Sequence, residues 1–344
     1  MAYQATKRNV FWNASALRLL ALILLFSGLM IPCRAHADGV PKHPSSNPLS
    51  ESEKVLLQGH ADDAVTRLQT LIAANPQDGR AHLLLCRAFY AEELTDRAIT
   101  ECEAALATQP NDSKSQDWMG RVYGLKADRS GPFTGYKLAS KVRTAFETAV
   151  QLDPQNDDAV NDLGEYYVSA PPIVGGGVDK ALALASRAEP QLPQTAHRIR
   201  ALAAEKQHDN ATAEREFKAA VAVANHPDAW FDLGHFYFRR NQKDQAIEAL
   251  HHAIDVDRAH GPALVDVASI LAKLHTETDV AENVLRSYLA SNAKTDAAPA
   301  FKAYVELGRL LEGDGDKQGA QTQFQTALAL AHDYAPAKKA IQHL

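Results

Sequence analysis

The sequence predicts an all-α fold, a right-handed α-solenoid of about eight helix-turn-helix repeats followed by a C-terminal capping helix. Three observations support this prediction. A pattern of small and large apolar residues recurs at a spacing near 34 residues along most of the 344-residue chain. No segment alternates apolar and polar residues with period two, as a half-buried strand would. With 46% apolar and 23% charged residues, the chain has enough apolar surface to fold, which excludes a disordered tail.

Residues 1–37 have the features of an export signal. Basic residues precede a run of 13 mainly apolar residues, Leu19–Ile31, and the segment contains no Asp or Glu. The run is shorter than the about 20 residues of a membrane-spanning helix, and a small-x-small cleavage site follows it. We therefore expect cleavage after Ala37 and export to the periplasm or the extracellular space. The alternative is an uncleaved inner-membrane anchor, and only in that case do we expect membrane contact.

Residues 38–50 hold three prolines and several small polar residues, which predicts a flexible lead-in. Without residues 1–37, the chain keeps 32 basic and 42 acidic residues, a net charge of −10. A chain this acidic has no general attraction to nucleic-acid phosphates or anionic lipid. We therefore expect no nucleic-acid partner.

The repeat is clearest in residues 227–260. Small residues stand where two antiparallel helices would come closest, and large residues fill the space beside them. Along the chain these positions are Trp230, Leu233, Gly234, Tyr237, Ala246, Leu250 and Ala253. The pattern resembles the tetratricopeptide repeat (TPR). Together with the export signal, the resemblance implies an exported bacterial member of that family.

Seven further copies of varying quality extend the resemblance over residues 45–334. Pro76 and Pro110, at the ends of the first two units, stand one 34-residue step apart. The third unit has an insert near 125–141, which we expect to place about ten extra residues between its two helices, and the fourth has an insert near 169–178. Residues 335–344 begin one more helix with a polar outer face. We expect it to cap an open-ended array, whose last repeat has no neighbour.

The second insert, Pro171–Ala181, leaves two interpretations open. In the first it is a wide turn, in which prolines stop one helix, glycines permit positive φ, and Asp179 caps the next helix. In the second it is a rim loop that closes over a ligand. Inserts in successive repeats of a solenoid should lie side by side.

Motifs for catalysis or metal binding are weak. The glycines of residues 312–319 join two helices, whereas a phosphate-binding loop follows a strand. His251 and His252 are adjacent on a predicted helix and point about 100° apart, which suits solvated surface better than a metal site. We therefore expect no catalytic residue, no metal and no cofactor, and a chain that is not an enzyme.

The TPR resemblance implies partner-binding residues on the first helix of each unit, which lines the concave surface in this family. The implied residues are Trp118 and Arg121 in the third unit, Asn161, Asp162 and Glu165 in the fourth, and Phe231, Asp232, His235 and Phe238 in the sixth. Aromatic anchors among acidic groups suit a peptide or helix with apolar and basic side chains. For each aromatic residue, packing within its own repeat is the alternative. The Lys, Asn and Arg set that holds the C-terminal carboxylate of chaperone tails does not occur at these positions.

These observations favour a non-enzymatic scaffold or adaptor of the bacterial cell envelope, which binds protein partners in its concave groove. The alternative is an accessory subunit or enzyme that handles envelope polysaccharide or glycan, with its site at the two inserts. A convergent pair of carboxylates in a cleft at the inserts would favour this alternative.

Cys86 and Cys102 remain after the expected cleavage. Within the second repeat they fall at nearly the same height on two antiparallel helices, and an exported chain permits a disulfide. The alternative is that both are small buried packing residues. Many helix pairs keep their Cα atoms about 8 Å or more apart, beyond the ~7 Å limit for a disulfide.

Overall fold

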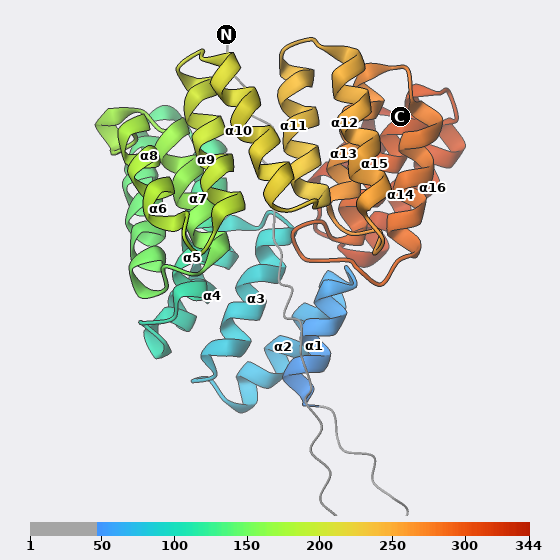
Figure 1. Ribbon diagram of the computed structural model, residues 1–344. Coiled ribbons are helices and arrows are strands. Elements are labelled where there is room, and N and C mark those ends of the chain that lie inside the picture. Colours follow the sequence, from blue (N-terminus) through green and yellow to red (C-terminus); the bar gives the residue numbers. More distant parts are fainter. Residues whose placement is uncertain (1–46) are drawn as a thin grey trace, which may run out of the picture.

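The computed structural model describes residues 47–344, and this part of the chain is an all-α repeat solenoid of eight helical hairpins and one terminal helix (Figure 1). The expected signal, residues 1–37, lies outside the described residues. The hairpins are α1 (Pro48–Leu57) with α2 (Ala61–Ala74), α3 (Gly79–Ala91) with α4 (Thr95–Thr108), α5 (Ser113–Asp128) with α6 (Pro132–Leu152), α7 (Asp157–Ser169) with α8 (Val178–Ala188), α9 (Pro193–Lys206) with α10 (Asn210–Val223), α11 (Pro227–Arg239) with α12 (Lys243–Val256), α13 (Ala263–Leu274) with α14 (Thr278–Ala290), and α15 (Ala300–Gly313) with α16 (Lys317–Leu330). The terminal helix is α17 (Ala335–His343), and a short 3-10 helix, η1 (Pro172–Val174), lies between α7 and α8.

The first helix begins inside the segment that the sequence analysis assigned to a flexible lead-in. Asn47 caps α1 by accepting a hydrogen bond from the Leu49 backbone N–H, and Pro48 occupies the first helical position. Residues 48–50 are therefore helical, which corrects the expected end of the lead-in.

In the third, sixth and eighth hairpins a glycine of the first helix packs against a large residue of the second. A Cβ atom added at Gly120 would lie 2.4 Å from Phe146 Cε1, and one at Gly308 would lie 2.4 Å from Phe324 Cε1. At Gly234 the nearest Leu250 atoms would be 3.0 Å away. The small positions of the sequence pattern are therefore the points of closest helix approach, as predicted.

The first helices of the repeats form an inner layer. Each of them, from α1 to α15, packs on the first helix of the next repeat, and in residues 47–344 the second helices of repeats that follow each other in sequence make no comparable contact. An array curves toward the layer in which its helices approach most closely. We call the surface of α3, α5, α7, α9 and α11 on this side the inner face.

The array is not open-ended, which corrects the sequence expectation. Helix α2 of the first repeat packs against α16 of the last. His332, after α16, donates its backbone N–H to Asp62 Oδ2 over 2.9 Å. Gly59, with φ of +88°, lies against Ala300, and a Cβ at Gly59 would come within 2.6 Å of the Ala300 nitrogen. Repeats one and eight are therefore neighbours in space.

Helix α17 nevertheless keeps the polar outer face predicted for a cap. Ala337 is buried, and Tyr334 packs edge-on against Phe301 at 4.8 Å between ring centroids. Its exposed polar residues are Lys338, Lys339, Gln342 and His343.

The insert of the third repeat does not form a loop, which corrects the expectation of extra residues between its two helices. Three residues separate α5 from α6, and the extra length is in the helices, which have 16 and 21 residues. The insert of the fourth repeat is a turn built on η1. Gly175 there has φ of +96°, a conformation that glycine adopts without strain.

The turn at η1 is connected to the neighbouring repeat through hydrogen bonds of Tyr166. The Tyr166 hydroxyl lies 2.9 Å from the Ala139 carbonyl oxygen of α6 and 2.8 Å from the Val174 carbonyl oxygen. The two inserts therefore do lie side by side. Asp179 does not cap α8, because Gly177 is the N-cap residue and Asp179 lies in the first turn.

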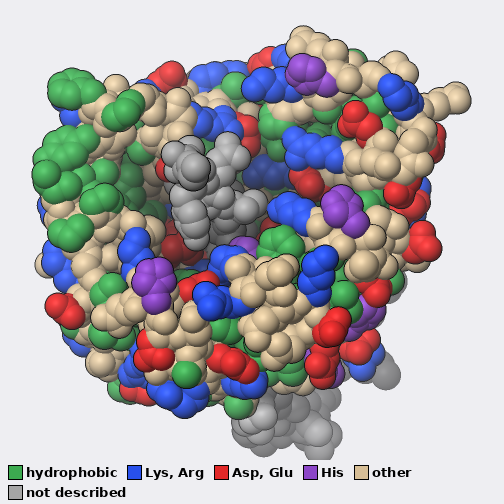
Figure 2. All heavy atoms as spheres, turned by 90° about the horizontal axis from the view of Figure 1, so that it is seen from above, with side chains coloured by type: hydrophobic (Ala, Val, Ile, Leu, Met, Phe, Trp, Pro, Cys, Tyr) green, Lys and Arg blue, Asp and Glu red, His purple; other side chains and the backbone are tan. Residues whose placement is uncertain are grey.

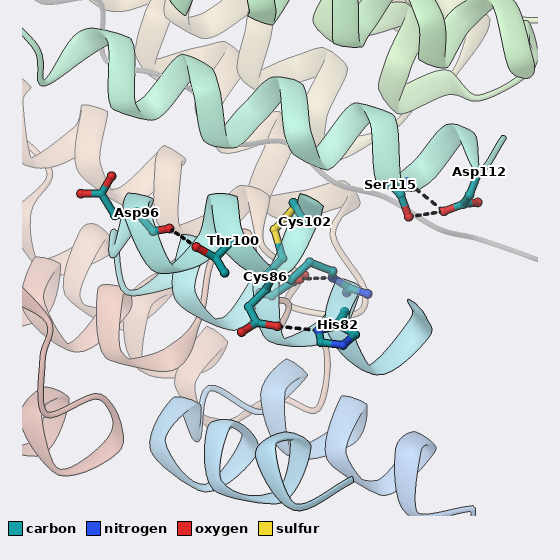
Figure 3. The surroundings of a disulfide bond; sticks show 10 residues. His82, Cys86, Asp96, Thr100, Cys102, Asp112 and Ser115 are labelled. Atoms are coloured by element: carbon teal, nitrogen blue, oxygen red, sulfur yellow. Dashed lines mark hydrogen bonds and ion pairs between the residues drawn. A yellow bond between two sulfur atoms is a disulfide. The ribbon is translucent and has the colours of Figure 1, made fainter. Parts of the chain in front are cut away.

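Cys86 of α3 and Cys102 of α4 are joined by a disulfide (Figure 3). Their Cα atoms are 5.3 Å apart, closer than in many helix pairs. Both residues are fully buried, as the packing alternative expected, and they are also bonded to each other. On the same two helices, His82 Nδ1 lies 2.6 Å from Glu101 Oε2.

Candidate functional site

All nine residues that the sequence analysis assigned to partner binding lie on inner helices. Trp118 and Arg121 belong to α5, the three residues of the fourth unit belong to α7, and the four of the sixth belong to α11. Two arginines, the buried Arg121 and the mostly buried Arg198, contact the polar members of the set on α7 and α11. The aromatic members fall into two separate groups.

Arg121 joins α5 to α7. Its Nε donates to Asp162 Oδ2 over 2.5 Å, and its Nη2 lies 2.8 Å from Asp117 Oδ2 within α5. Burial disfavours the charge of Arg121, but Asp117 and Asp162 outweigh it and raise the pKa of the guanidinium. Burial also raises the pKa of Asp117 and of Asp162, and the attraction of Arg121 only partly opposes this.

Arg198 of α9 is the residue that connects the other predicted positions. It donates from Nη1 to Asn161 Oδ1 over 2.7 Å and from Nε to Asp232 Oδ2 over 3.1 Å, and its Nη2 lies 3.2 Å from Glu165 Oε2. One guanidinium therefore links α7, α9 and α11. Burial opposes its charge, and the carboxylates of Asp232 and Glu165 nevertheless raise its pKa.

Arg198 was not predicted from the sequence, because its repeat matches the pattern poorly. A signal was present, since Arg198 stands 37 residues after Asn161 and 34 before Asp232, close to one repeat in each direction. Residues one repeat apart on inner helices face each other across adjacent helices.

Trp118 packs between cations. It is 6% exposed, and the guanidinium carbons of Arg121 and Arg87 lie 4.9 Å and 5.5 Å from its ring centroid. Tyr90 meets it edge-on at 5.3 Å. These contacts bury Trp118 against α3 of the preceding repeat as well as against Arg121 of its own repeat.

The aromatic residues of α11 form a row along the inner face. Phe231 and His235 have ring centroids 5.5 Å apart, and His235 and Phe238 have centroids 6.3 Å apart. Phe231 is buried, whereas His235 and Phe238 are half-buried. The row therefore offers ring surface next to the Asp232 carboxylate, which faces Arg198.

Carboxylates outnumber cations over α5 to α11 of the inner face. The residues concerned are Asp117, Asp158, Asp162, Glu165 and Asp232 against Arg121 and Arg198. Within residues 47–344, no three His, Cys, Asp or Glu side chains come together as ligands for one metal ion. Asp117 and Asp232 are buried, whereas Asp158, Asp162 and Glu165 are partly exposed, so these three carboxylates make the inner surface acidic beside the aromatic row.

The described helices include none that is both long and apolar enough to cross a membrane.

Comparison with known families identifies tetratricopeptide-type repeats in two stretches. Residues 55–121 match the tetratricopeptide repeat, and residues 197–331 match the middle TPR-like domain of cilia and flagella-associated protein 70. The TPR resemblance drawn from the sequence is therefore confirmed. Protein NPGR2 of Arabidopsis thaliana is 32% identical over 100 residues, which are 28% of this chain and 13% of NPGR2. This chain thus corresponds to a small part of that relative.

Solved structures resemble the chain in fold. Yeast Tom70 is 17% identical and covers 89% of this chain and 65% of its own, with a TM-score of 0.53. A thermophilic TPR protein of Thermus thermophilus is 18% identical and covers 65% of this chain and 97% of its own, with a TM-score of 0.45. At these identities the likeness concerns the fold alone.

Proposed function

We propose that this protein is a non-enzymatic scaffold that binds a peptide or helix of a partner protein on its inner face. The observation that carries the proposal is the aromatic row Phe231, His235 and Phe238 beside a surplus of inner carboxylates. Repeat arrays of this type offer large surfaces instead of closed catalytic pockets, and they generally act as interaction scaffolds.

The charges of the inner face define the partner. Carboxylates remain in excess after Arg121 and Arg198 have bound their neighbours, so a partner gains by presenting Lys or Arg side chains. Apolar side chains of the same partner would pack on the half-buried rings of His235 and Phe238. A partner with alternating apolar and basic residues satisfies both requirements.

Binding is tested with two labelled twelve-residue peptides, one alternating Leu with Lys and one alternating Leu with Glu. We expect the basic peptide to raise fluorescence anisotropy on addition of the full chain and the acidic peptide to leave it unchanged. The double variant His235→Ala, Phe238→Ala should bind at least about tenfold more weakly. The matched control is His251→Ala, His252→Ala on the second helix α12, which should bind as the wild type does.

Equal affinity of the two double variants would contradict binding at the aromatic row. Equal affinity for both peptides would contradict the role of the inner carboxylates. Far-ultraviolet circular dichroism of each variant confirms that the helices are retained.

The cellular setting belongs to the same proposal. The basic and apolar character of residues 1–37 supports export, cleavage after Ala37 and action in the bacterial cell envelope. N-terminal sequencing of exported material tests this directly, because a mature chain that starts at Asp38 would support it and a retained Met1 would contradict it. Among the described residues, none of the contacts at the two inserts supports the glycan-handling alternative.

A further inference from the structure

The three most exposed large apolar side chains of residues 47–344 lie in the two segments that lengthen repeats three and four. Ile173 is 76% exposed, Phe133 is 73% exposed and Tyr136 is 50% exposed. Phe133 and Tyr136 are one turn apart at the start of α6, and Ile173 is the middle residue of η1. Exposed apolar side chains that cluster on a protein surface mark a contact site.

The two segments are adjacent in space. Helix η1 packs on α6, and the Tyr166 hydroxyl reaches a carbonyl oxygen of each, at Ala139 and Val174. Hydrophobic side chains gather at one side of the face in Figure 2, on the side where α6 and α8 lie in Figure 1. We call Phe133, Tyr136 and Ile173 the apolar tip.

The surroundings of the apolar tip are basic, although the whole chain carries −6. Residues 129–146 contain four basic residues and no Asp or Glu. Lys137 Nζ lies 4.4 Å from the centroid of the Phe133 ring, and Lys141 is exposed one turn further along α6. Lys180 Nζ, on the η1 side, donates to the Gly175 carbonyl oxygen over 2.8 Å.

Three carboxylates border this basic surface, and the first of them, the exposed Asp128 at the end of α5, directly precedes it. Glu147 lies one turn beyond Arg143 and accepts a hydrogen bond from the Tyr167 hydroxyl, and Asp179 lies in the first turn of α8. The cations of α6 and α8 outnumber these carboxylates, so the field at the apolar tip is positive. The net charge of the whole chain predicted no attraction to anionic lipid. That net charge does not describe this part of the surface.

We propose that the apolar tip docks on a membrane surface that carries anionic phospholipid headgroups. Phe133, Tyr136 and Ile173 would enter the boundary between headgroups and acyl chains, while Lys137 and Lys141 would remain at the headgroup phosphates. The protein would then lie on the membrane without spanning it.

The same features argue against two other occupants. A second copy of the chain, paired about a two-fold axis at this surface, would bring the α6 lysines of both copies together, and like charges repel. An acidic protein would need a separate matching pocket for each of three protruding side chains. A bilayer yields to protruding side chains without preformed pockets.

The test follows backbone hydrogen exchange of the full chain with and without lipid vesicles. We expect residues 132–141 and 171–176 to exchange more slowly with vesicles of three parts phosphatidylcholine to one part phosphatidylglycerol. Pure phosphatidylcholine vesicles should have little effect. A local measurement is needed because the apolar run in residues 1–37 could itself hold the chain on a vesicle.

Two variants and a control complete the test. Phe133→Ser with Ile173→Ser should abolish the local protection, and Lys137→Gln with Lys141→Gln should raise the lipid concentration for half-maximal protection about 30-fold. Val223→Ser, an exposed apolar residue of α10, is the matched control and should behave as the wild type does.

Unchanged exchange of both segments with anionic vesicles would overturn the proposal. So would equal protection by both kinds of vesicle, or equal protection of the serine variant and the wild type. If both segments are instead protected by an acidic polypeptide such as polyglutamate and not by vesicles, the surface binds protein and the membrane proposal is wrong.

Discussion

Arg87 and Asp296 are 209 residues apart in the sequence, yet Arg87 Nε donates a hydrogen bond to Asp296 Oδ2 over 2.6 Å. Arg87 belongs to α3, and Asp296 belongs to the segment between α14 and α15. The Asp296 side chain is buried and that of Arg87 is mostly buried, and Glu53 of α1 adds a second carboxylate 3.3 Å from Arg87 Nη1. The contact joins the second repeat to the seventh. Since solenoid repeats otherwise contact only their neighbours in sequence, it couples the two ends of the array.

Replacing Asp296 with Ala should destabilise the closed array. The buried Arg87 would lose its main partner, and breaking a buried ion pair costs about 3 kcal/mol or more of unfolding free energy. Urea denaturation measures this loss, and small-angle scattering should show an increased radius of gyration as the ends separate. The matched control is Glu282→Ala, which breaks an exposed pair with Arg286 inside α14 and should cost less than about 1 kcal/mol. Equal losses in the two variants would contradict a role of the closure in stability.

The same junction should make stability depend on pH. Glu92 is buried between the ends of the array, faced by Asp62, Asp333, His332 and Arg97, and burial raises its pKa to about 7. The unfolded chain releases this proton near pH 4.5, so the stability of the folded state falls as the pH rises from there to about 7. A hydrogen bond with Asp62 raises the pKa of His332. The stability that the protonated His332 contributes is therefore fully present below pH 6.5 and is lost as the pH rises through the raised pKa.

Both groups therefore weaken the closure in the same direction as the pH rises. Glu92→Gln mimics the protonated carboxyl, so this variant should match the wild type at pH 5 and exceed it by about 2 kcal/mol at pH 8. Denaturation midpoints at pH 5, 6.5 and 8 provide the measurement. The idea fails if the difference between variant and wild type is the same at all three pH values.

The disulfide between Cys86 and Cys102 should be a main source of stability in the second repeat. It closes a loop with a sequence separation of 16, for which the chain-entropy estimate is about 3 kcal/mol. The double variant Cys86→Ser, Cys102→Ser should lose about that much, and a reducing agent should then have no further effect on it. Thiol counting in denaturant should give two more reactive thiols per wild-type chain after reduction than before. No increase on reduction would show that the bond is absent.

The parts of the fold that depend on local pattern could be predicted from the sequence, and the parts that depend on distant contacts could not. Gly234 and Leu250 meet inside one hairpin, so their spacing alone indicated the contact. Asp296 lies in a tail outside the repeat pattern, and its partner Arg87 is five repeats away along the chain, so no local signal connected them. The closure of the array was therefore not foreseen.

The candidate site follows the same division. The repeat pattern assigned Asn161, Glu165 and Asp232 to the inner face, because it fixes which helix and which side each residue occupies. It did not show that Arg198 of the irregular fifth repeat binds all three, since that depends on the packing of three helices. It also gave the length of the insert at 125–141, but the expectation that these residues stand between the two helices was wrong, because they lengthen α5 and α6.

Two glycines of α15 should respond in opposite ways to the same substitution. At Gly308, an added methyl group would lie 2.4 Å from Cε1 of the fully buried Phe324, so the hairpin must shift. Such overpacking costs about 1–3 kcal/mol, against a gain in helix propensity of about 1 kcal/mol, and Gly308→Ala should be destabilised by about 1 kcal/mol. At Gly313, no atom lies within 4 Å of the added methyl group, and Gly313→Ala should be stabilised by up to about 1 kcal/mol.

A second substitution distinguishes overpacking from other effects of the Gly308 change. The sixth repeat has Leu250 at the position of Phe324 and leaves 3.0 Å at Gly234, so Leu is compatible with more room at this contact. Phe324→Leu should therefore cost less in the Gly308→Ala background than in the wild type, and a double-mutant cycle of urea midpoints measures the difference. Additive costs in that cycle, or destabilisation by Gly313→Ala as large as by Gly308→Ala, would contradict the role of close helix approach in this hairpin.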